Sequence, residues 1–346
     1  MTWRCADMKL SILDQSPVPE GSTPAEALAE TVSLAIEADR LGYHRFWVSE
    51  HHAARGLAGS SPEVLMAHLA AVTSRIRIGS GAVLLPYYSA YKVAENFRVL
   101  EALYPGRIDL GLGRAAGGGA LAARALQENR TGGAELYELQ IRDLLSYLYG
   151  APDDEHRFAG LETSPQVSTA PELWLLGSSR DSAALAARLG TGYAYARFIN
   201  SDGGSMAVRS FRSSFRPSPA ASAPRALVSV FAICAETSAE ADRLAASMDL
   251  SLVQLEKGHV STGTPSVETA LGYNYTPYDR FRIGDNRRRM VLGSPDEVRR
   301  QFTALIEEYQ CEEIMFATLV HRYEDKLKSL RLIADVCGLH GEAGAD

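Results

Sequence analysis

Short apolar runs alternate with longer amphipathic segments along almost the whole chain. The runs are near-continuous, which is typical of parallel strands buried on both faces. They predict strands at residues 10–13, 44–49, 76–85, 108–113, 173–176, 193–197, 227–234 and 313–318. Between them, apolar positions at helical spacing predict helices that begin near residues 24, 62, 90, 134, 179, 206, 238, 295 and 323.

Helix start signals support this reading. Thr23-Pro24-Ala25-Glu26 and Ser294-Pro295-Asp296-Glu297 each combine a capping box with proline at the first helical position. The alternation amounts to about eight βα units, which predicts a single α/β domain built as a (β/α)8 TIM barrel. An open doubly wound sheet would alternate in the same way, but no Gly-x-Gly-x-x-Gly follows the first strand.

Two stretches interrupt the repeat. Residues 153–171 are rich in Pro, Ser, Thr and charge and predict an excursion between units. Residues 257–289 contain several Gly and Pro residues among Tyr273, Tyr275 and Tyr278, which favours an insertion loop before the last strand that acts as a lid or lines a substrate pocket. We expect the barrel domain at 8–338, a disordered extension at 1–7 and a flexible tail at 339–346.

Composition narrows the function. The 346 residues carry a net charge of −7, and 46% are hydrophobic. A large core is therefore available, while the basic surface that a nucleic-acid-binding protein needs is missing.

The number and spacing of the cysteines indicate in which cellular compartment the protein works. Cys5, Cys234, Cys311 and Cys337 are far apart and form no Cys-x-x-Cys, which argues against a zinc site or a disulfide framework. No apolar run approaches the ~20 residues of a membrane span. We expect a protein of the reducing cytoplasm, with no bound metal and no membrane contact.

Active sites of such barrels lie where the strands end, so the residues after each strand are the candidates. The second strand ends at Glu50-His51-His52. A solvated turn or a structural histidine is one interpretation. Acid–base or hydrogen-bonding chemistry, which suits a histidine near its ordinary pKa, is the other.

Three further segments fit a flat, phosphorylated ligand. The small residues at 79–82 allow close approach of a ring, although a bulge required by the barrel explains them as well. Arg114 ends the fourth strand and is a forked cation. Gly177-Ser178-Ser179 opens a helix whose free N–H groups suit a phosphate, although Ser179 also reads as a simple N-cap.

Taken in order, these segments resemble the bacterial luciferase-like flavin monooxygenases. The resemblance runs from Met8 to Val336 and rests on Leu13-Asp14-Gln15-Ser16-Pro17, Trp47 to His52, residues 79–86, residues 105–114 and Leu176-Gly177-Ser178-Ser179. It implies reduced FMN and O2 as co-substrates, a separate NAD(P)H-dependent flavin reductase, a small organic substrate and a homodimer.

The resemblance also implies roles for individual residues. His51 matches the family's catalytic histidine, with His52 beside it. Gly81 and Ala82 match the non-proline cis peptide that packs against the flavin. The phosphate-binding positions are matched by Arg114, Gly177, Ser178, Ser179 and Ser182.

Departures from luciferase itself point to another branch. Ser178 replaces a glutamate, and residues 115–120 hold no counterpart of the aspartate that follows the phosphate-binding arginine. The Asp14-Gln15-Ser16-Pro17 opening resembles the branch found in natural-product tailoring. The resemblance therefore implies oxygen insertion (hydroxylation, epoxidation or a Baeyer–Villiger reaction) into a polyketide or aromatic substrate, as in antibiotic biosynthesis. The alternatives are a deazaflavin-dependent dehydrogenase of the same fold and a flavin-binding barrel without catalysis.

Overall fold

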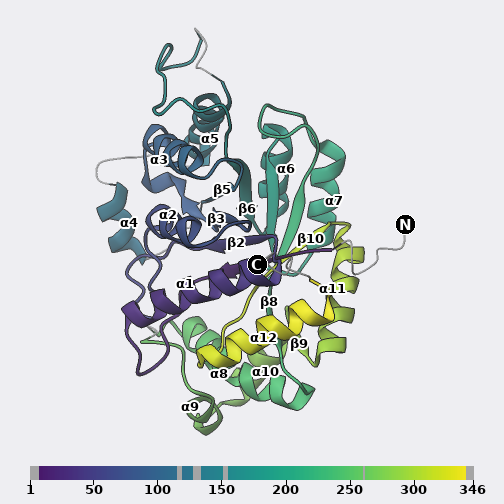
Figure 1. The fold of residues 1–346 in the computed structure, drawn as a ribbon. Coiled ribbons are helices and arrows are strands. Elements are labelled where there is room, and N and C mark those ends of the chain that lie inside the picture. Colours follow the sequence, from purple (N-terminus) through teal and green to yellow (C-terminus); the bar gives the residue numbers. More distant parts are fainter. Residues whose placement is uncertain (1–7, 115–118, 128–133, 151–154, 260–261, 340–346) are drawn as a thin grey trace, which may run out of the picture.

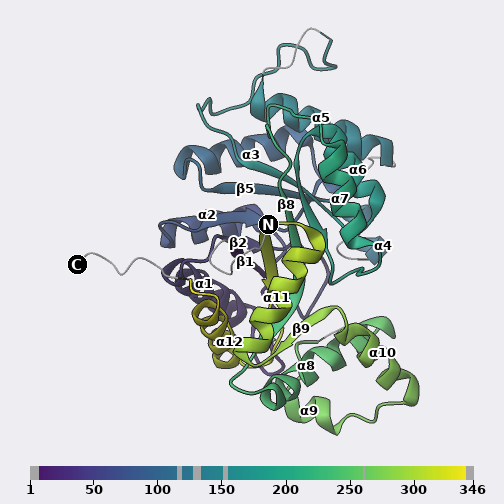
Figure 2. The ribbon, with the colours of Figure 1, turned by 90° about the vertical axis from the view of Figure 1, so that its right-hand side faces the viewer.

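The strands close into a barrel, as predicted. The computed structural model describes residues 8–114, 119–127, 134–150, 155–259 and 262–339. Eight parallel strands follow one another as β1-β2-β3-β5-β6-β7-β8-β10, and β10 pairs with β1 to complete the circle. The helices surround this barrel (Figure 1), and Figure 2 shows the molecule turned by 90°, with the right-hand side of Figure 1 facing the viewer. The (β/α)8 fold is confirmed.

The elements are these. The strands are β1 Lys9–Asp14, β2 Arg45–Val48, β3 Arg77–Ser80, β4 Val83–Leu84, β5 Ile108–Gly113, β6 Glu172–Gly177, β7 Gly192–Ala196, β8 Ala226–Cys234, β9 Met290–Gly293 and β10 Glu313–Ala317. The helices are α1 Pro24–Leu41, α2 Pro62–Val72, α3 Ala90–Leu103, α4 Gly119–Gln127, α5 Ala134–Tyr149, α6 Arg180–Leu189, α7 Gly204–Ser214, α8 Ser238–Glu256, α9 Val267–Gly272, α10 Pro277–Arg287, α11 Pro295–Tyr309 and α12 Tyr323–Val336.

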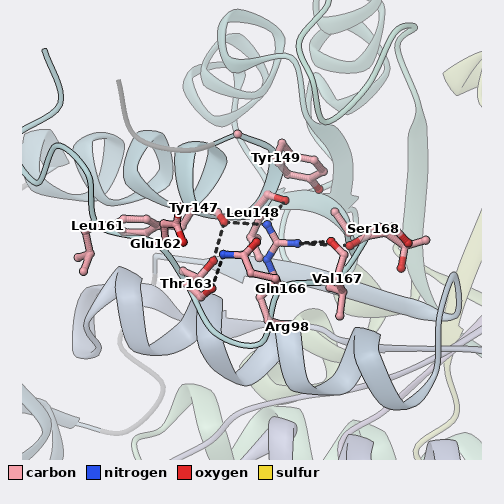
Figure 3. Close-up of a pocket in the computed structure, with 13 residues that line it drawn as sticks. Arg98, Tyr147, Leu148, Tyr149, Leu161, Glu162, Thr163, Gln166, Val167 and Ser168 are labelled. Carbon is pink, nitrogen blue, oxygen red and sulfur yellow. Dashed lines mark hydrogen bonds between the residues drawn. The ribbon is translucent and has the colours of Figure 1, made fainter. Parts of the chain in front are cut away.

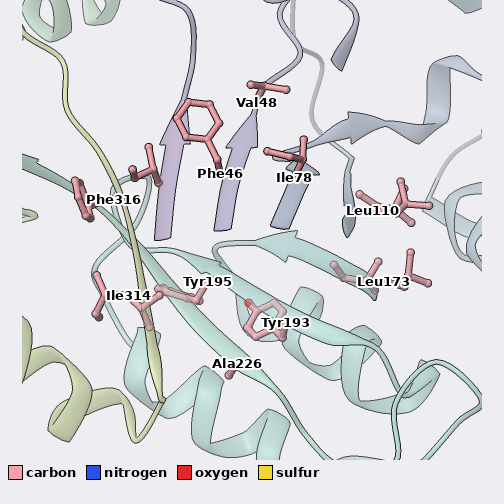
Figure 4. Close-up of a cluster of buried hydrophobic side chains, with 14 of the residues drawn as sticks. Phe46, Val48, Ile78, Leu110, Leu173, Tyr193, Tyr195, Ala226, Ile314 and Phe316 are labelled. Carbon is pink, nitrogen blue, oxygen red and sulfur yellow. The ribbon is translucent and has the colours of Figure 1, made fainter. Parts of the chain in front are cut away.

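Side chains alternate between the two surfaces of the barrel wall. Those that point outward, including Phe46, Ile78 and Phe316, form the large buried cluster beneath the helices (Figure 4). Those that point inward fill the barrel, where Trp47 and Trp174 meet edge to face with ring centroids 5.8 Å apart. Both faces of each strand are thus buried, which explains the continuous apolar runs in the sequence.

Charged residues near the beginnings of five strands meet inside the barrel and form what we call the floor network: Arg45, Arg77, Asp109, Glu172 and Glu313. The Arg45 guanidinium lies 2.9 Å from a carboxylate oxygen of each of Asp109, Glu172 and Glu313. Burial alone would raise the pKa of Asp109, but the adjacent Arg45 and Arg77 guanidinium groups hold it below its ordinary value. Asp109 is therefore ionised, and each member of the network comes from a different strand.

The expected continuous strand at 76–85 is interrupted. β3 pairs with β5 through Gly79 and Asp109, and pairing resumes at Val83 and Leu112. Between these two pairs, residues 80–82 of one strand lie opposite residues 110–111 of the other, which is a one-residue bulge. The Ser80 hydroxyl fills the interruption by bonding the backbone of β5. The bulge interpretation of these small residues was therefore correct for the strand geometry.

The segment expected to be an insertion loop at 257–289 contains helices α9 and α10 and leads into β9, which pairs with the far half of β8. Thr276 starts α10 with a capping box, a local signal that the glycine and proline content obscured. Tyr273 and Tyr275 pack against a buried cluster on α8 and α9, and Tyr278 is exposed. Helices α8 to α10 gather at one end of the molecule (Figures 1 and 2).

The described part of the other excursion, 155–171, is irregular and is tied to the barrel's helices. Tyr91 of α3 donates to the Glu162 carbonyl at 2.9 Å, and Thr163 donates to the Tyr147 carbonyl of α5 at 3.0 Å. Helix α4 and strand β9 were not predicted. Residues 1–7 and 340–346, expected to be a disordered extension and most of a flexible tail, lie outside the described residues. No described helix is long and apolar enough to cross a membrane.

The floor network makes a stability prediction. Arg45→Met removes the cation that three carboxylates share, two of them buried, so we expect the free energy of unfolding to fall by about 3–5 kcal/mol in urea denaturation. Arg40→Met is the control, because Arg40 is a surface residue of α1 paired with Glu37, and its loss should cost under about 1 kcal/mol. Equal losses in the two variants would contradict this account.

Candidate active site

The mouth of the barrel collects the residues predicted from the sequence. His51 and His52 follow β2, Gly81 and Ala82 lie between β3 and β4, and Arg114 follows β5. The segment 177–179 ends β6 and begins α6. Because β2, β3, β5 and β6 are consecutive neighbours in a parallel barrel, these residues lie at the same end.

His51 is half-buried and held at two points. Its backbone N–H donates to the Gly59 carbonyl at 2.9 Å, and its Nδ1 lies 3.0 Å from the Ser49 hydroxyl. Burial, followed by the neighbouring His52, lowers the pKa of His51 below its ordinary value. A neutral imidazole at this position can accept a proton or a hydrogen bond through its second nitrogen.

His52 bonds a residue to which sequence reasoning gave no role. Its Nε2 lies 2.6 Å from Oε1 of Glu50, whose side chain is fully buried. Tyr88 donates to the same oxygen at 2.7 Å, and the Leu84 amide donates to Oε2 at 2.9 Å. The only signal in the sequence was a carboxylate next to two histidines.

The peptide bond between Gly81 and Ala82 is cis, as the resemblance implied. The Gly81 amide donates to the Val48 carbonyl at 2.8 Å, so this segment is tied to the end of β2. A Cβ on Gly81 would come within 2.8 Å of the end of the Leu13 side chain and 3.3 Å of the Trp47 ring, so packing inside the barrel favours glycine there.

Ser179 and Ser182 form a capping box at the start of α6. The Ser179 hydroxyl accepts from the Ser182 amide at 3.2 Å, and the Ser182 hydroxyl donates to the Ser179 carbonyl at 2.8 Å. Ser182 also contacts Tyr193, and a Cβ on Gly177 would collide with the Ser182 hydroxyl at 2.2 Å. Gly177 and Ser182 therefore shape the turn.

Arg114 and Ser178 remain available to a ligand. Neither side chain has a hydrogen-bond partner among the residues that the structure describes. The pairing of Leu112 with Leu175 carries Arg114 to the level of Gly177, beside the start of α6. A free guanidinium next to a helix N-terminus and a serine hydroxyl is a donor set suited to a phosphate.

A separate cavity of about 350 Å³ lies away from these residues, between α3, the end of α5 and the segment 161–170. Figure 3 shows the Arg98 guanidinium directed at backbone carbonyls there. Arg98 donates to the carbonyls of Tyr147, Leu148 and Val167. It therefore clamps the excursion onto the barrel, and no mouth residue lines this cavity.

Comparison with known proteins identifies the family. The family model described as luciferase-like monooxygenase matches residues 8–309. The chain belongs to this family. It is a flavin-dependent monooxygenase, as the resemblance predicted.

Individual relatives span nearly the whole chain. The Bacillus subtilis protein YwcH is 53% identical, over 95% of this chain and 98% of its own length. The N-acetyl-S-alkylcysteine monooxygenase of the same organism is 40% identical over 95% and 98%. The crystal structure of apo-MsnO8 superposes with a TM-score of 0.88 at 40% identity, covering 98% of this chain and 100% of that one.

The mouth fits the flavin that this family uses. The phosphate-type donors are Arg114, Ser178 and the start of α6, whereas His51 and the cis peptide stand on the neighbouring strands β2 and β3. The ring and the phosphate of one flavin would thus be held by different strand ends of the same mouth. Among the described residues, no group of three or more His, Cys, Asp or Glu side chains is placed to hold a metal ion.

The lowered pKa of His51 is directly measurable. NMR titration of its imidazole should give a midpoint below 6.5, so that the ring is neutral at pH 7 and gains its proton only as the pH falls. His52→Gln should move this midpoint only part of the way back, because burial is the larger cause. A midpoint at or above 6.5 in the unmodified protein would refute the assignment.

Proposed function

We propose that the protein is the oxygenase of a two-component system that uses reduced FMN and O2 to insert one oxygen atom into an organic substrate. A separate NAD(P)H-dependent reductase supplies the reduced flavin. The observation that carries the proposal is that one barrel mouth holds both a neutral histidine, His51, and a set of hydrogen-bond donors suited to a phosphate, Arg114 and Ser178 at the start of α6. When bound, reduced FMN supplies the electrons that activate O2.

The chain's own groups divide the remaining tasks. Arg114, Ser178 and the N-terminus of α6 bind the phosphate, and Ser179, Ser182 and Gly177 keep the turn in shape. Gly81 and Ala82 supply the surface against which the ring packs. His51 Nε2 holds or moves a proton at the reacting centre, because Nδ1 is engaged with Ser49.

Two substrate classes have support. The natural-product branch that the Asp14-Gln15-Ser16-Pro17 opening resembles favours a polyketide or other aromatic substrate. The relative named N-acetyl-S-alkylcysteine monooxygenase, which is 40% identical over nearly the full length, favours an S-alkylated amino-acid derivative. An oxygenation assay with both classes, read by mass spectrometry for one added oxygen atom, discriminates them.

A homodimer in the reducing cytoplasm completes the proposal. Val64 of α2 and Val99 and Leu103 of α3 are exposed apolar side chains on helices that contact each other, which suits a subunit interface. Among the described residues, Cys234 and Cys311 are free and buried, as expected where thiols stay reduced.

Stopped-flow absorbance tests the reaction. Protein and reduced FMN, mixed anaerobically and then exposed to oxygenated buffer, should give a flavin transient that free FMN does not show. His51→Ala should retain flavin binding but lower the yield of oxygenated product by about 100-fold or more, in the range for loss of an acid–base group. Reoxidation as in free solution would overturn the proposal and favour a non-catalytic barrel, or a dehydrogenase if deazaflavin binds more tightly.

Paired titrations test the phosphate site. Arg114→Ala should weaken FMN binding by about 10- to 100-fold, the value of a charge-assisted hydrogen bond, and leave riboflavin binding unchanged. Arg299→Ala, on the surface of α11, should change neither affinity. Equal effects on FMN and riboflavin would remove Arg114 from the phosphate site.

A further inference from the structure

A three-residue unit at the mouth joins Glu50, His52 and Tyr88. Oε1 of Glu50 lies 2.6 Å from His52 Nε2 and 2.7 Å from the Tyr88 hydroxyl. The two donors are 3.4 Å from each other. The Tyr87 ring meets the His52 ring edge to face, with centroids 6.0 Å apart, which restrains the plane of the imidazole.

The second carboxylate oxygen faces a donor that cannot change its role. Oε2 accepts from the backbone N–H of Leu84 at 2.9 Å, and a backbone amide only donates. Oε1 therefore has to serve His52 and Tyr88 by itself. An ionised carboxylate is the side chain that accepts on both oxygens, so its partner nitrogen on His52 carries the hydrogen.

We propose that Glu50 is a positioning residue that fixes His52 in the tautomer with hydrogen on Nε2 and leaves Nδ1 as its ligand-facing acceptor. Nδ1 has no hydrogen-bond partner among the described residues, so it is the nitrogen open to a bound molecule. The two histidines then present opposite nitrogens: His51 is held through Nδ1 and His52 through Nε2. This inference rests on the proposed function only for the identity of the bound molecule that Nδ1 contacts.

Glu50 also links the histidines to the phosphate donors. Leu84 belongs to β4, which pairs with β5 through Leu84 and Gly113, and Arg114 comes next. A single carboxylate thus connects His52 on the β2 side with the strand that ends at Arg114. The connection explains why a charged side chain is fully buried at this point: each of its oxygens has at least one donor.

The test is histidine-specific 15N NMR on the protein without flavin, combined with Glu50→Gln. In the unmodified protein, His52 Nε2 should carry the hydrogen. Glutamine keeps the shape but has one acceptor oxygen, so its NH2 group must face either Leu84 N–H or the His52–Tyr88 pair. We expect the His52 hydrogen to move at least partly to Nδ1 and turnover to fall about 10-fold or more.

Tyr88→Phe is the matched control, because it removes one donor and leaves the Glu50–His52 bond; the tautomer should persist. Hydrogen on Nδ1 in the unmodified protein would overturn the proposal. The spectrum of the unmodified protein decides the matter even if that variant does not fold. Because NMR needs no flavin, a correct tautomer without oxygenation would refute the proposed function and leave the positioning role intact.

Discussion

The floor network is the constraint on which the rest of the molecule depends. Arg45 binds carboxylates from three other strands, and Arg77 binds the same Asp109. A parallel strand that slipped by one residue would turn its inward side chains outward and break these ion pairs. Charges that cannot be buried unpaired thus fix the register of β2, β3, β5, β6 and β10 together. Because the register is shared, it also decides which residues stand at the mouth.

Strand β2 shows how the floor network is connected to the mouth at the opposite end of the barrel. It begins with Arg45 in the floor, continues with Trp47 inside the barrel and leads to Glu50 and the histidines at the mouth. The Trp47 indole donates to Asp109 at 2.9 Å, and Gly79 leaves room for its ring, since a Cβ there would lie 2.4 Å away. Positioning at the mouth is therefore built on the packed and ion-paired contacts inside the barrel.

The sequence was most informative where a signal is local. Capping boxes and helical spacing placed α1, α3 and α12 within a residue or two, because these features act within one or two turns. The bulge between β3 and β4 was left open, since it depends on the pairing partner β5 and on Ser80 bonding across to Gly111. Helices α9 and α10 were missed because glycine and proline content outweighed the Thr276 cap.

The residues of the candidate site also fall into those that local sequence signals reveal and those that only the folded barrel reveals. Arg114 and the start of α6 were recognisable because an arginine and a helix N-terminus carry their chemistry in their own sequence. Ser179 and Ser182 looked alike as phosphate ligands, and only the structure shows that the Ser182 hydroxyl is already bonded within the cap and to Tyr193. Glu50 is the opposite case. Its donors come from His52 two residues away and from Leu84 and Tyr88 more than thirty residues along the chain, so its meaning exists only once the barrel has closed.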